Sequence, residues 1–212
     1  EIVVPAYGSA HNSAPPFEGT AQAQGAAVLD RGEGQIQRGS QYWAESGWVT
    51  SESWLTATGK GVWSYTLPSL SDGEYHLRAR AWTLDPYSDT SPAEVVFVYD
   101  TVSPTGATLI TPTGGVAFAS ATGIVLEWQP VGPDGGSDLA YVVRLDGRQL
   151  HTTTQSAYTV IQIADGPHTW GVQVLDAAGN RSGWVTATFS IARECIWLPL
   201  VVRCRRQSLR RC

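Results

Sequence analysis

Residues 72–82 read Asp-Gly-Glu-Tyr-His-Leu-Arg-Ala-Arg-Ala-Trp, and residues 165–175 read Asp-Gly-Pro-His-Thr-Trp-Gly-Val-Gln-Val-Leu. In both stretches an Asp-Gly turn precedes a run in which every second side chain belongs to an inward-facing series. A period of two predicts a strand with one buried and one exposed face. The stretches lie 93 positions apart, a spacing that suits a β-sandwich domain and is too long for a solenoid repeat. The sequence therefore predicts two sandwiches built on one plan.

Other short runs of strand character surround the second stretch, with turn residues such as Asp146-Gly147 between them. These runs are 124–128, 140–145, 149–153, 158–161 and 184–191. The composition agrees, because 22 Gly and 12 Pro among 212 residues supply turns at short intervals. No apolar run approaches the ~20 residues of a membrane span. The predicted fold class is all-β, with two tandem sandwiches and terminal extensions.

We predict four segments along the chain. They are an N-terminal arm at 1–16, an Ig-like sandwich at 17–103, a fibronectin III-like sandwich at 104–192, and a C-terminal apolar strand with a basic tail at 193–212. The joint between the sandwiches contains Pro104 and, further on, Pro112. Proline restricts the backbone, so this joint is expected to be semi-rigid.

Particular motifs carry a resemblance to known modules. The second half, with Trp128, Tyr141, the Asp165-Gly166 turn and the ending 176–182, resembles fibronectin type III modules of bacterial surface proteins. The first half resembles bacterial Ig-like modules through Gly-Thr-Ala at 19–21, Gly-Val-Trp at 61–63, the 72–82 stretch and the Val-rich run 95–99. The resemblance implies a spacer, an adhesin, a sugar binder or a fibre subunit. His168 stands where these modules are expected to carry a corner tyrosine.

The sequence contains none of the common catalytic patterns. It has no Gly-x-Ser-x-Gly elbow, His-Glu-x-x-His helix, phosphate loop or dinucleotide fingerprint. The four histidines are scattered, and pairs such as Asp85 with Asp89 lie in turns, where aspartate serves turn formation more often than calcium binding. We therefore predict a protein that is not an enzyme, with no catalytic residues, no metal site and no cofactor.

Charge is unevenly distributed along the chain. Residues 1–192 hold 18 acidic and 8 basic side chains, a net charge of −10, while residues 193–212 hold six Arg and one Glu, a net charge of +5. An acidic body repels nucleic acid, so no nucleic-acid partner is expected. The absence of Met favours a chain whose signal peptide has been removed, over the edge of a longer sequence. The expected location is extracellular or at the cell surface.

Three tryptophans, Trp43, Trp48 and Trp54, lie five and six residues apart in a Gly/Ser/Thr-rich region. Two interpretations are open. They plug the end of the sandwich core, the favoured interpretation because Trp is usually buried against its own domain. Alternatively they form an exposed platform on which surface glycans stack.

Both ends of the chain carry strand-forming apolar residues. The N-terminal arm holds Ile2, Val3 and Val4, and the C-terminal run holds Ile196, Trp197, Leu198, Leu200, Val201 and Val202. Each strand either joins a sheet of its own chain or completes a sheet of the next copy. The second alternative makes a homopolymer, and the function predicted from it is a structural subunit of an extracellular fibre or pilus-like assembly. A carbohydrate-binding or adhesive module is the alternative.

All three cysteines, Cys195, Cys204 and Cys212, fall in the last 18 residues. If 196–202 is one extended strand, Cys195 and Cys204 are about 30 Å apart, beyond the reach of a disulfide, and that pair would need a hairpin. Cys204 with Cys212 closes a short loop more easily and is the candidate disulfide. An odd count in an exported protein also favours a bridge between chains.

Overall fold

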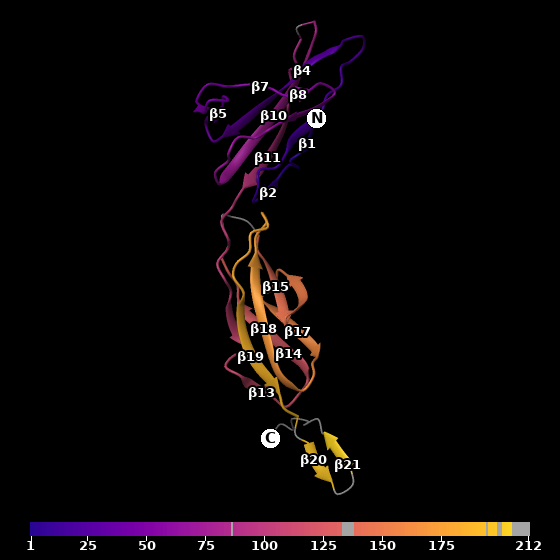
Figure 1. Cartoon of the computed structure of the whole chain (residues 1–212), viewed down its shortest axis with the longest axis vertical. Coiled ribbons are helices and arrows are strands. Elements are labelled where there is room, and N and C mark those ends of the chain that lie inside the picture. The colour runs from indigo at the N-terminus through magenta and orange to yellow at the C-terminus, as the bar shows by residue number, and fades with distance from the viewer. Residues whose placement is uncertain (86, 133–137, 194, 199–200, 205–212) are drawn as a thin grey trace. The chain divides into compact units, whose positions relative to one another are not determined.

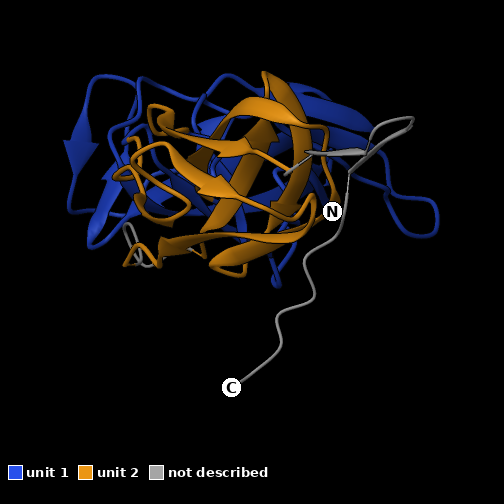
Figure 2. Ribbon diagram, turned by 90° about the horizontal axis from the view of Figure 1, so that it is seen from below, with its two compact units in different colours: residues 1–102, 177–180 blue, residues 103–176, 181–212 orange. Residues whose placement is uncertain are grey.

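A computed structural model describes residues 1–85, 87–132, 138–193, 195–198 and 201–204. Throughout these ranges the regular structure is strand, without a helix, as the sequence predicts (Figure 1). The chain divides into two compact units, which Figure 2 colours separately. Unit 1 comprises 1–102 with 177–180, and unit 2 comprises 103–176 with 181–212. Each unit is described on its own below.

Unit 1 contains two sheets. The smaller has the order β1 (Ile2–Val4), β3 (Phe17–Thr20), β9 (Val62–Tyr65) and β8 (Thr58–Gly59). The larger has the order β2 (Ser9–His11), β11 (Ala93–Tyr99), β10 (Gly73–Thr83), β4 (Leu29–Arg38), β5 (Gln41–Trp43) and β6 (Trp48–Val49), with β7 (Leu55–Thr56) also paired to β4. The long pair β10 and β4 forms the centre of this larger sheet.

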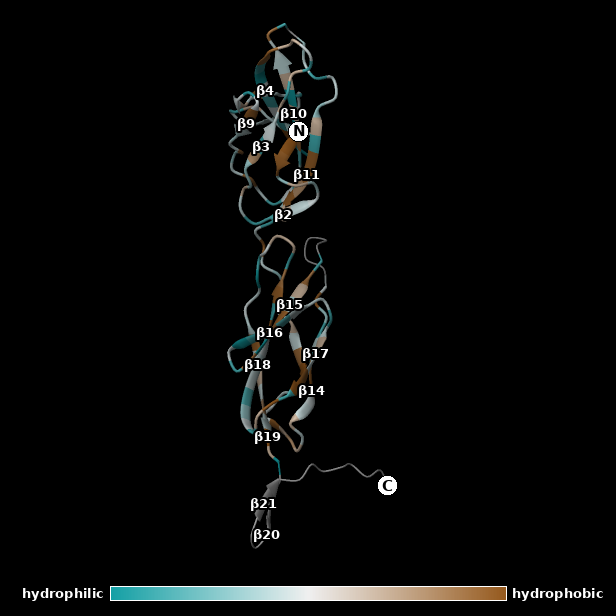
Figure 3. Cartoon of the chain, turned by 90° about the vertical axis from the view of Figure 1, so that its right-hand side faces the viewer, coloured by the Kyte–Doolittle hydropathy of each residue, from teal (hydrophilic) through white to brown (hydrophobic). Residues whose placement is uncertain are grey.

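The core of unit 1 follows the predicted alternation in β10. Tyr75 and Leu77 are fully buried, while His76 and Arg78, which alternate with them, face outward and are half-buried. Tyr75 stacks on Phe97 of β11 with ring centroids 5.5 Å apart, a geometry favoured by aromatic pairs. Hydropathy colouring shows hydrophobic and hydrophilic stretches along the strands (Figure 3). The core therefore lies between the two sheets.

Unit 2 repeats this two-sheet plan. One sheet has the order β12 (Thr108–Thr111), β14 (Thr122–Gln129) and β17 (Ala157–Gln162). The other has the order β13 (Val116–Phe118), β19 (Val185–Ile191), β18 (Gly166–Leu175), β15 (Ala140–Leu145) and β16 (Arg148–Thr153). Trp128 and Trp170 are fully buried between the sheets, 6.4 Å apart by ring centroid. Trp170 Nε1 donates a hydrogen bond of 2.7 Å to the Pro112 carbonyl.

In the N-terminal arm, the structure shows the first of the two alternatives, pairing within its own chain. Ile2–Val4 forms β1, which pairs antiparallel with β3, and Ser9–His11 forms β2, which pairs parallel with β11. The Ile2 side chain is only 9 % exposed and belongs to the core of unit 1. Burying this side chain favours pairing within the chain by about 1.5–3 kcal/mol. Residues 2–4 are thus an edge strand of their own sandwich.

The C-terminal segment differs from the expected single strand. Its described residues form a two-stranded sheet of their own, with β20 (Cys195–Leu198) antiparallel to β21 (Val201–Cys204). Alternation of apolar residues is the same in a straight strand and in a hairpin, so the sequence pattern did not locate the turn. Ile196, Trp197 and Leu198 lie in β20, and Val201 and Val202 lie in β21. Leu200 and Cys212 lie outside the described residues.

Candidate functional sites in the two sandwiches

The outward face of β10 and β4 carries charged and aromatic side chains in register. Alternation places Arg78, Arg80 and Trp82 on this face of β10. Across the strand pair, Arg80 lies opposite Glu33 and Trp82 lies opposite Arg31. Directly opposed side chains on one face are close enough to interact. The register therefore gathers two arginines, a carboxylate and an indole.

Arginine and tryptophan alternate along this face. The guanidinium of Arg31 lies 4.7 Å from the Trp82 ring centroid, and that of Arg80 lies 5.3 Å from the same ring. On its other side Arg80 lies 3.9 Å from Trp54, and Arg78 lies 5.7 Å from Trp54. All four distances are within the range of a cation–π contact. We call these five residues the Arg–Trp ladder.

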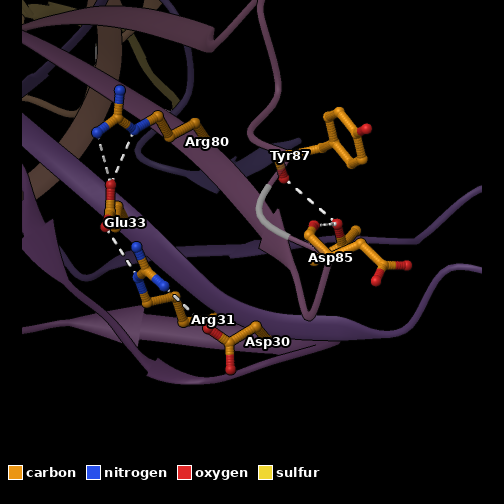
Figure 4. Close-up of polar contacts among 7 residues, drawn as sticks. Asp30, Arg31, Glu33, Arg80, Asp85 and Tyr87 are labelled. Carbon is orange, nitrogen blue, oxygen red and sulfur yellow. Dashed lines mark hydrogen bonds and ion pairs between the residues drawn. The ribbon is translucent and has the colours of Figure 1, made fainter.

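Carboxylates fix the guanidinium groups of the ladder. Figure 4 shows Glu33 between two arginines, accepting hydrogen bonds of 2.9 Å from Arg31 Nε and 2.8 Å from Arg80 Nε. The Glu33 side chain is only 11 % exposed. Its burial raises the pKa of this carboxyl, but polar contacts with Trp82 and the two arginines outweigh burial, so the pKa lies below its ordinary value.

The charged groups of the ladder are paired, which suits a structural role. Each guanidinium is engaged by a carboxylate, because Arg78 lies 3.6 Å from both Glu52 and Glu94. Guanidinium and carboxylate groups paired in this way provide neither an activated nucleophile nor a free general base. The sequence signal for the ladder was the Arg-x-Arg-x-Trp alternation at 78–82. That pattern does not reveal the contribution of Trp54, which reaches the face from another segment.

Replacing Arg80 with alanine is expected to lower the free energy of unfolding of unit 1 by about 1–3 kcal/mol. The substitution removes two cation–π contacts and one partner of the nearly buried Glu33. Arg80→Lys should recover only part of the loss, because an ammonium does not stack as a planar guanidinium does. Chemical denaturation measures the change. Lys60→Ala, at an exposed position, serves as control, and an equal loss there would contradict a specific role for the ladder.

Trp43, Trp48 and Trp54, the residues of the alternative glycan platform, do not all lie on one face. Trp43 and Trp48 pack against the core cluster of unit 1, as an edge-to-face pair 5.6 Å apart. Trp48 also lies 6.1 Å from the buried Tyr75. Trp54 belongs instead to the outward-facing ladder. The geometry of Trp43 and Trp48 is that of a plug at the edge of the core.

A groove opens in unit 1 between the two sheets. It has a volume of about 600 Å³, and its apolar lining comprises Trp63 with Ala21, Ala79, Ala81 and Ala93. Glu1, Asp89 and Arg80 are among its polar lining residues. Small side chains leave this space because alanine fills little volume between facing strands. A concavity in which polar groups stand among apolar side chains is a candidate binding site.

A polar site in unit 2 involves His168, which is 8 % exposed. In unit 1, the Tyr75 hydroxyl donates to the carbonyl of Ser71, four residues earlier. In unit 2, His168 Nε2 lies 3.0 Å from the carbonyl of Ala164, also four residues earlier, and its Nδ1 lies 2.7 Å from Asp146 Oδ2. Histidine therefore contacts the carbonyl four residues earlier, as tyrosine does in unit 1, and adds a contact with Asp146.

Both ring nitrogens of His168 face oxygen acceptors, so both donate when the imidazole is a cation. Although partial burial lowers the pKa of His168, the hydrogen bonds with Asp146 and the Ala164 carbonyl outweigh burial and raise it above its ordinary value. Asp146 is held in turn by a 2.9 Å hydrogen bond from the Thr169 backbone N–H. The site joins the turn after β15 to β18.

Within the described ranges, no three His, Cys, Asp or Glu side chains are grouped as metal ligands. Over the same ranges, no helix has the length and hydropathy needed to cross a membrane.

The fold of this chain is similar to solved structures of other proteins. No protein-family model and no curated protein sequence matches the chain. Among solved structures, the chain is similar to the fibronectin(III)-like modules of Clostridium thermocellum CbhA, with 16 % identity, a TM-score of 0.58, and coverage of 90 % of this chain and 93 % of that chain. A weaker match is the BSP domain of a biofilm-associated protein, with 14 % identity, a TM-score of 0.28, and coverage of 87 % of this chain and 29 % of that one. The predicted fibronectin III-like, all-β fold of bacterial modules is confirmed by the first of these structures.

Proposed function

We propose that this chain is a non-catalytic structural module of a bacterial extracellular surface protein, and that copies assemble head to tail. In the proposed assembly, the C-terminal segment of one copy occupies the groove in unit 1 of the next. The groove is the observation that carries the proposal. A repeated contact of this kind does not close on itself and generates a filament.

Apolar residues in the C-terminal segment and in the groove support this pairing. The sequences of β20 and β21 are Cys-Ile-Trp-Leu and Val-Val-Arg-Cys, and a two-stranded hairpin alone in water is only marginally stable. The groove has a volume of about 600 Å³, and Trp63 and four alanines contribute apolar surface to a lining that also holds charged and polar residues. Burying a large apolar side chain there contributes about 1.5–3 kcal/mol before the cost of ordering the segment.

Charge complementarity supports a second copy as the occupant. The C-terminal 20 residues carry a net charge of +5 and the remaining body carries −10. The groove itself has Glu1 and Asp89 among its lining residues. Opposite charges of this size accelerate the encounter and orient the partners, although they add less to the final affinity. Assembly should therefore be slower at high salt.

The fold and the ladder support a structural role. Fibronectin III-like sandwiches serve many purposes, and their function resides in surface sites. On the outward face of unit 1 the charged side chains are engaged with one another in the Arg–Trp ladder. Contacts of this kind stabilise the surface of the sandwich, which is consistent with a structural role.

Filling the groove is the direct test of this function. We expect the intact chain to form oligomers in light scattering and filaments in negative-stain images, and Ala81→Phe to abolish both while circular dichroism stays unchanged. Ala26→Phe, at an exposed loop position outside the groove, is the matched control. Leu198→Asp with Val201→Asp should have the same effect as Ala81→Phe, because buried unpaired charges are costly.

Two outcomes would contradict the proposal. Filaments that persist in Ala81→Phe would show that the groove is not the acceptor. A monomeric intact chain that is retained on a glycan array would instead favour the carbohydrate-binding alternative.

A further inference from the structure

The hairpin places two cysteines opposite each other. Its register pairs Leu198 with Val201, Trp197 with Val202, Ile196 with Arg203, and Cys195 with Cys204. Sequence reasoning excluded a Cys195–Cys204 bond for a straight strand and named a hairpin as the condition for it. The structure meets that condition.

We propose that Cys195 and Cys204 are joined by a disulfide bond across the C-terminal hairpin. This proposal rests on the register alone and is independent of the proposed assembly. It replaces Cys204–Cys212 as the intramolecular pair.

The type of strand pair favours the bond. In antiparallel strands, hydrogen-bonded and non-hydrogen-bonded pairs alternate. Leu198 and Val201 close the hairpin with two residues between them, and the closing pair of such a connection is hydrogen-bonded. Counting outward in steps of one pair, Cys195 and Cys204 form a non-hydrogen-bonded pair. Cα atoms in such pairs lie about 4.5 Å apart, within the 4.4–6.8 Å that disulfides require.

The proposed disulfide would also stabilise the hairpin. Among the described residues, β20 and β21 pair only with each other. A hairpin of this size has only marginal stability in water. A bridge at its open end links the first residue of β20 to the last residue of β21 and removes many open conformations of the segment.

Forming the bond is a two-electron oxidation. The two thiols release two protons and two electrons as the sulfur–sulfur bond forms. A low-molecular-weight disulfide such as oxidised glutathione accepts them by exchange and leaves as two thiols. Cys212 is then the third, unpaired cysteine of the chain, with one thiol available for a bond between chains.

Peptide mapping of the intact chain tests the pairing. After equilibration with oxidised glutathione, free thiols are alkylated and the chain is cut with trypsin, which cleaves after Arg193, Arg203 and Arg205. We expect peptide 194–203 linked to peptide 204–205, and alkylation or mixed disulfide only at Cys212. The linked species should disappear on reduction. Linkage of Cys204 to Cys212, or alkylation of Cys195 without reduction, would overturn the proposal.

Cys212→Ser provides an independent readout. If the hairpin bond exists, this variant retains the 194–203 to 204–205 link and has no free thiol by titration. If Cys204 pairs with Cys212 in the native chain, the variant instead shows two free thiols. Neither readout depends on whether the chain assembles, since both use denatured protein: mapping follows alkylation, and titration uses a separate sample that is not alkylated.

Discussion

Replacing Trp170 with alanine is expected to lower the free energy of unfolding of unit 2 by about 3–5 kcal/mol, the usual cost of truncating a buried Trp. The indole is fully buried and packs against Trp128. Its removal leaves a cavity that the surrounding strands fill only in part. It also removes the 2.7 Å hydrogen bond to the Pro112 carbonyl, an acceptor that then lacks this partner.

Two further substitutions make this expectation specific. Trp170→Phe retains most of the apolar volume but not the N–H donor, so it should cost less than alanine. Trp184→Ala is the matched control, because Trp184 in the same unit is only half-buried and stacks 4.0 Å from the Arg144 guanidinium. Chemical denaturation followed by fluorescence and circular dichroism gives the three values. An equal loss for Trp170→Ala and Trp184→Ala would contradict the assigned place of Trp170 in the core.

Unit 2 is expected to lose stability as the pH rises above neutrality because of His168. Its pKa is raised in the folded state by the contacts with Asp146 and Ala164. A raised pKa means that the folded state binds the proton more tightly than the unfolded state. The stabilisation is therefore complete below the unfolded pKa of about 6.5 and is lost as the pH rises through the folded pKa.

The loss has a structural origin. When the imidazole releases one proton, one ring nitrogen presents a lone pair to an oxygen acceptor, and the donation to Asp146 or to Ala164 ends. Hydrogen bonds to charged groups are worth about 1.5–3 kcal/mol, and 1 kcal/mol shifts the melting temperature of a domain of this size by about 4–8 °C. A melting temperature that falls by several degrees between pH 6 and pH 9 is the expected result.

Variants of the corner identify the titrating group. His168→Tyr restores the residue found at this corner in unit 1 and should remove the pH dependence while retaining the bond to the residue four positions earlier. Asp146→Asn should lower the folded pKa of His168, because the carboxylate no longer attracts the cation. Differential scanning calorimetry from pH 5 to pH 9 measures both. The same pH dependence in wild type and His168→Tyr would show that another group titrates.

The strands and the two-sandwich plan could be predicted from the sequence alone. Alternation at 72–82 and its repetition at 165–175 are local patterns, and burial of one strand face depends on little else. The inward positions of Tyr75, Leu77 and Trp170 follow from that alternation, and all three are fully buried. The turn at Asp146-Gly147 was also readable, because both residues have positive φ, 50° and 79°, which Asp-Gly tolerates.

The contacts between distant segments were decided only by the tertiary structure. The Arg–Trp ladder depends on the register that places Trp82 opposite Arg31 and on Trp54, which no local pattern connects to either. The edge strand at 2–4 depends on the core space that Ile2 fills.

The position of a turn inside an alternating segment was likewise beyond the sequence. A strand and a hairpin have the same period of two, and they differ only in which residues lie opposite one another. At the C-terminal end this difference separates two outcomes, Cys195 about 30 Å from Cys204 in a straight strand or directly opposite it in the hairpin. The residues themselves determined that strands form here. Pairing between strands, a property of the folded chain, determined which side chains meet.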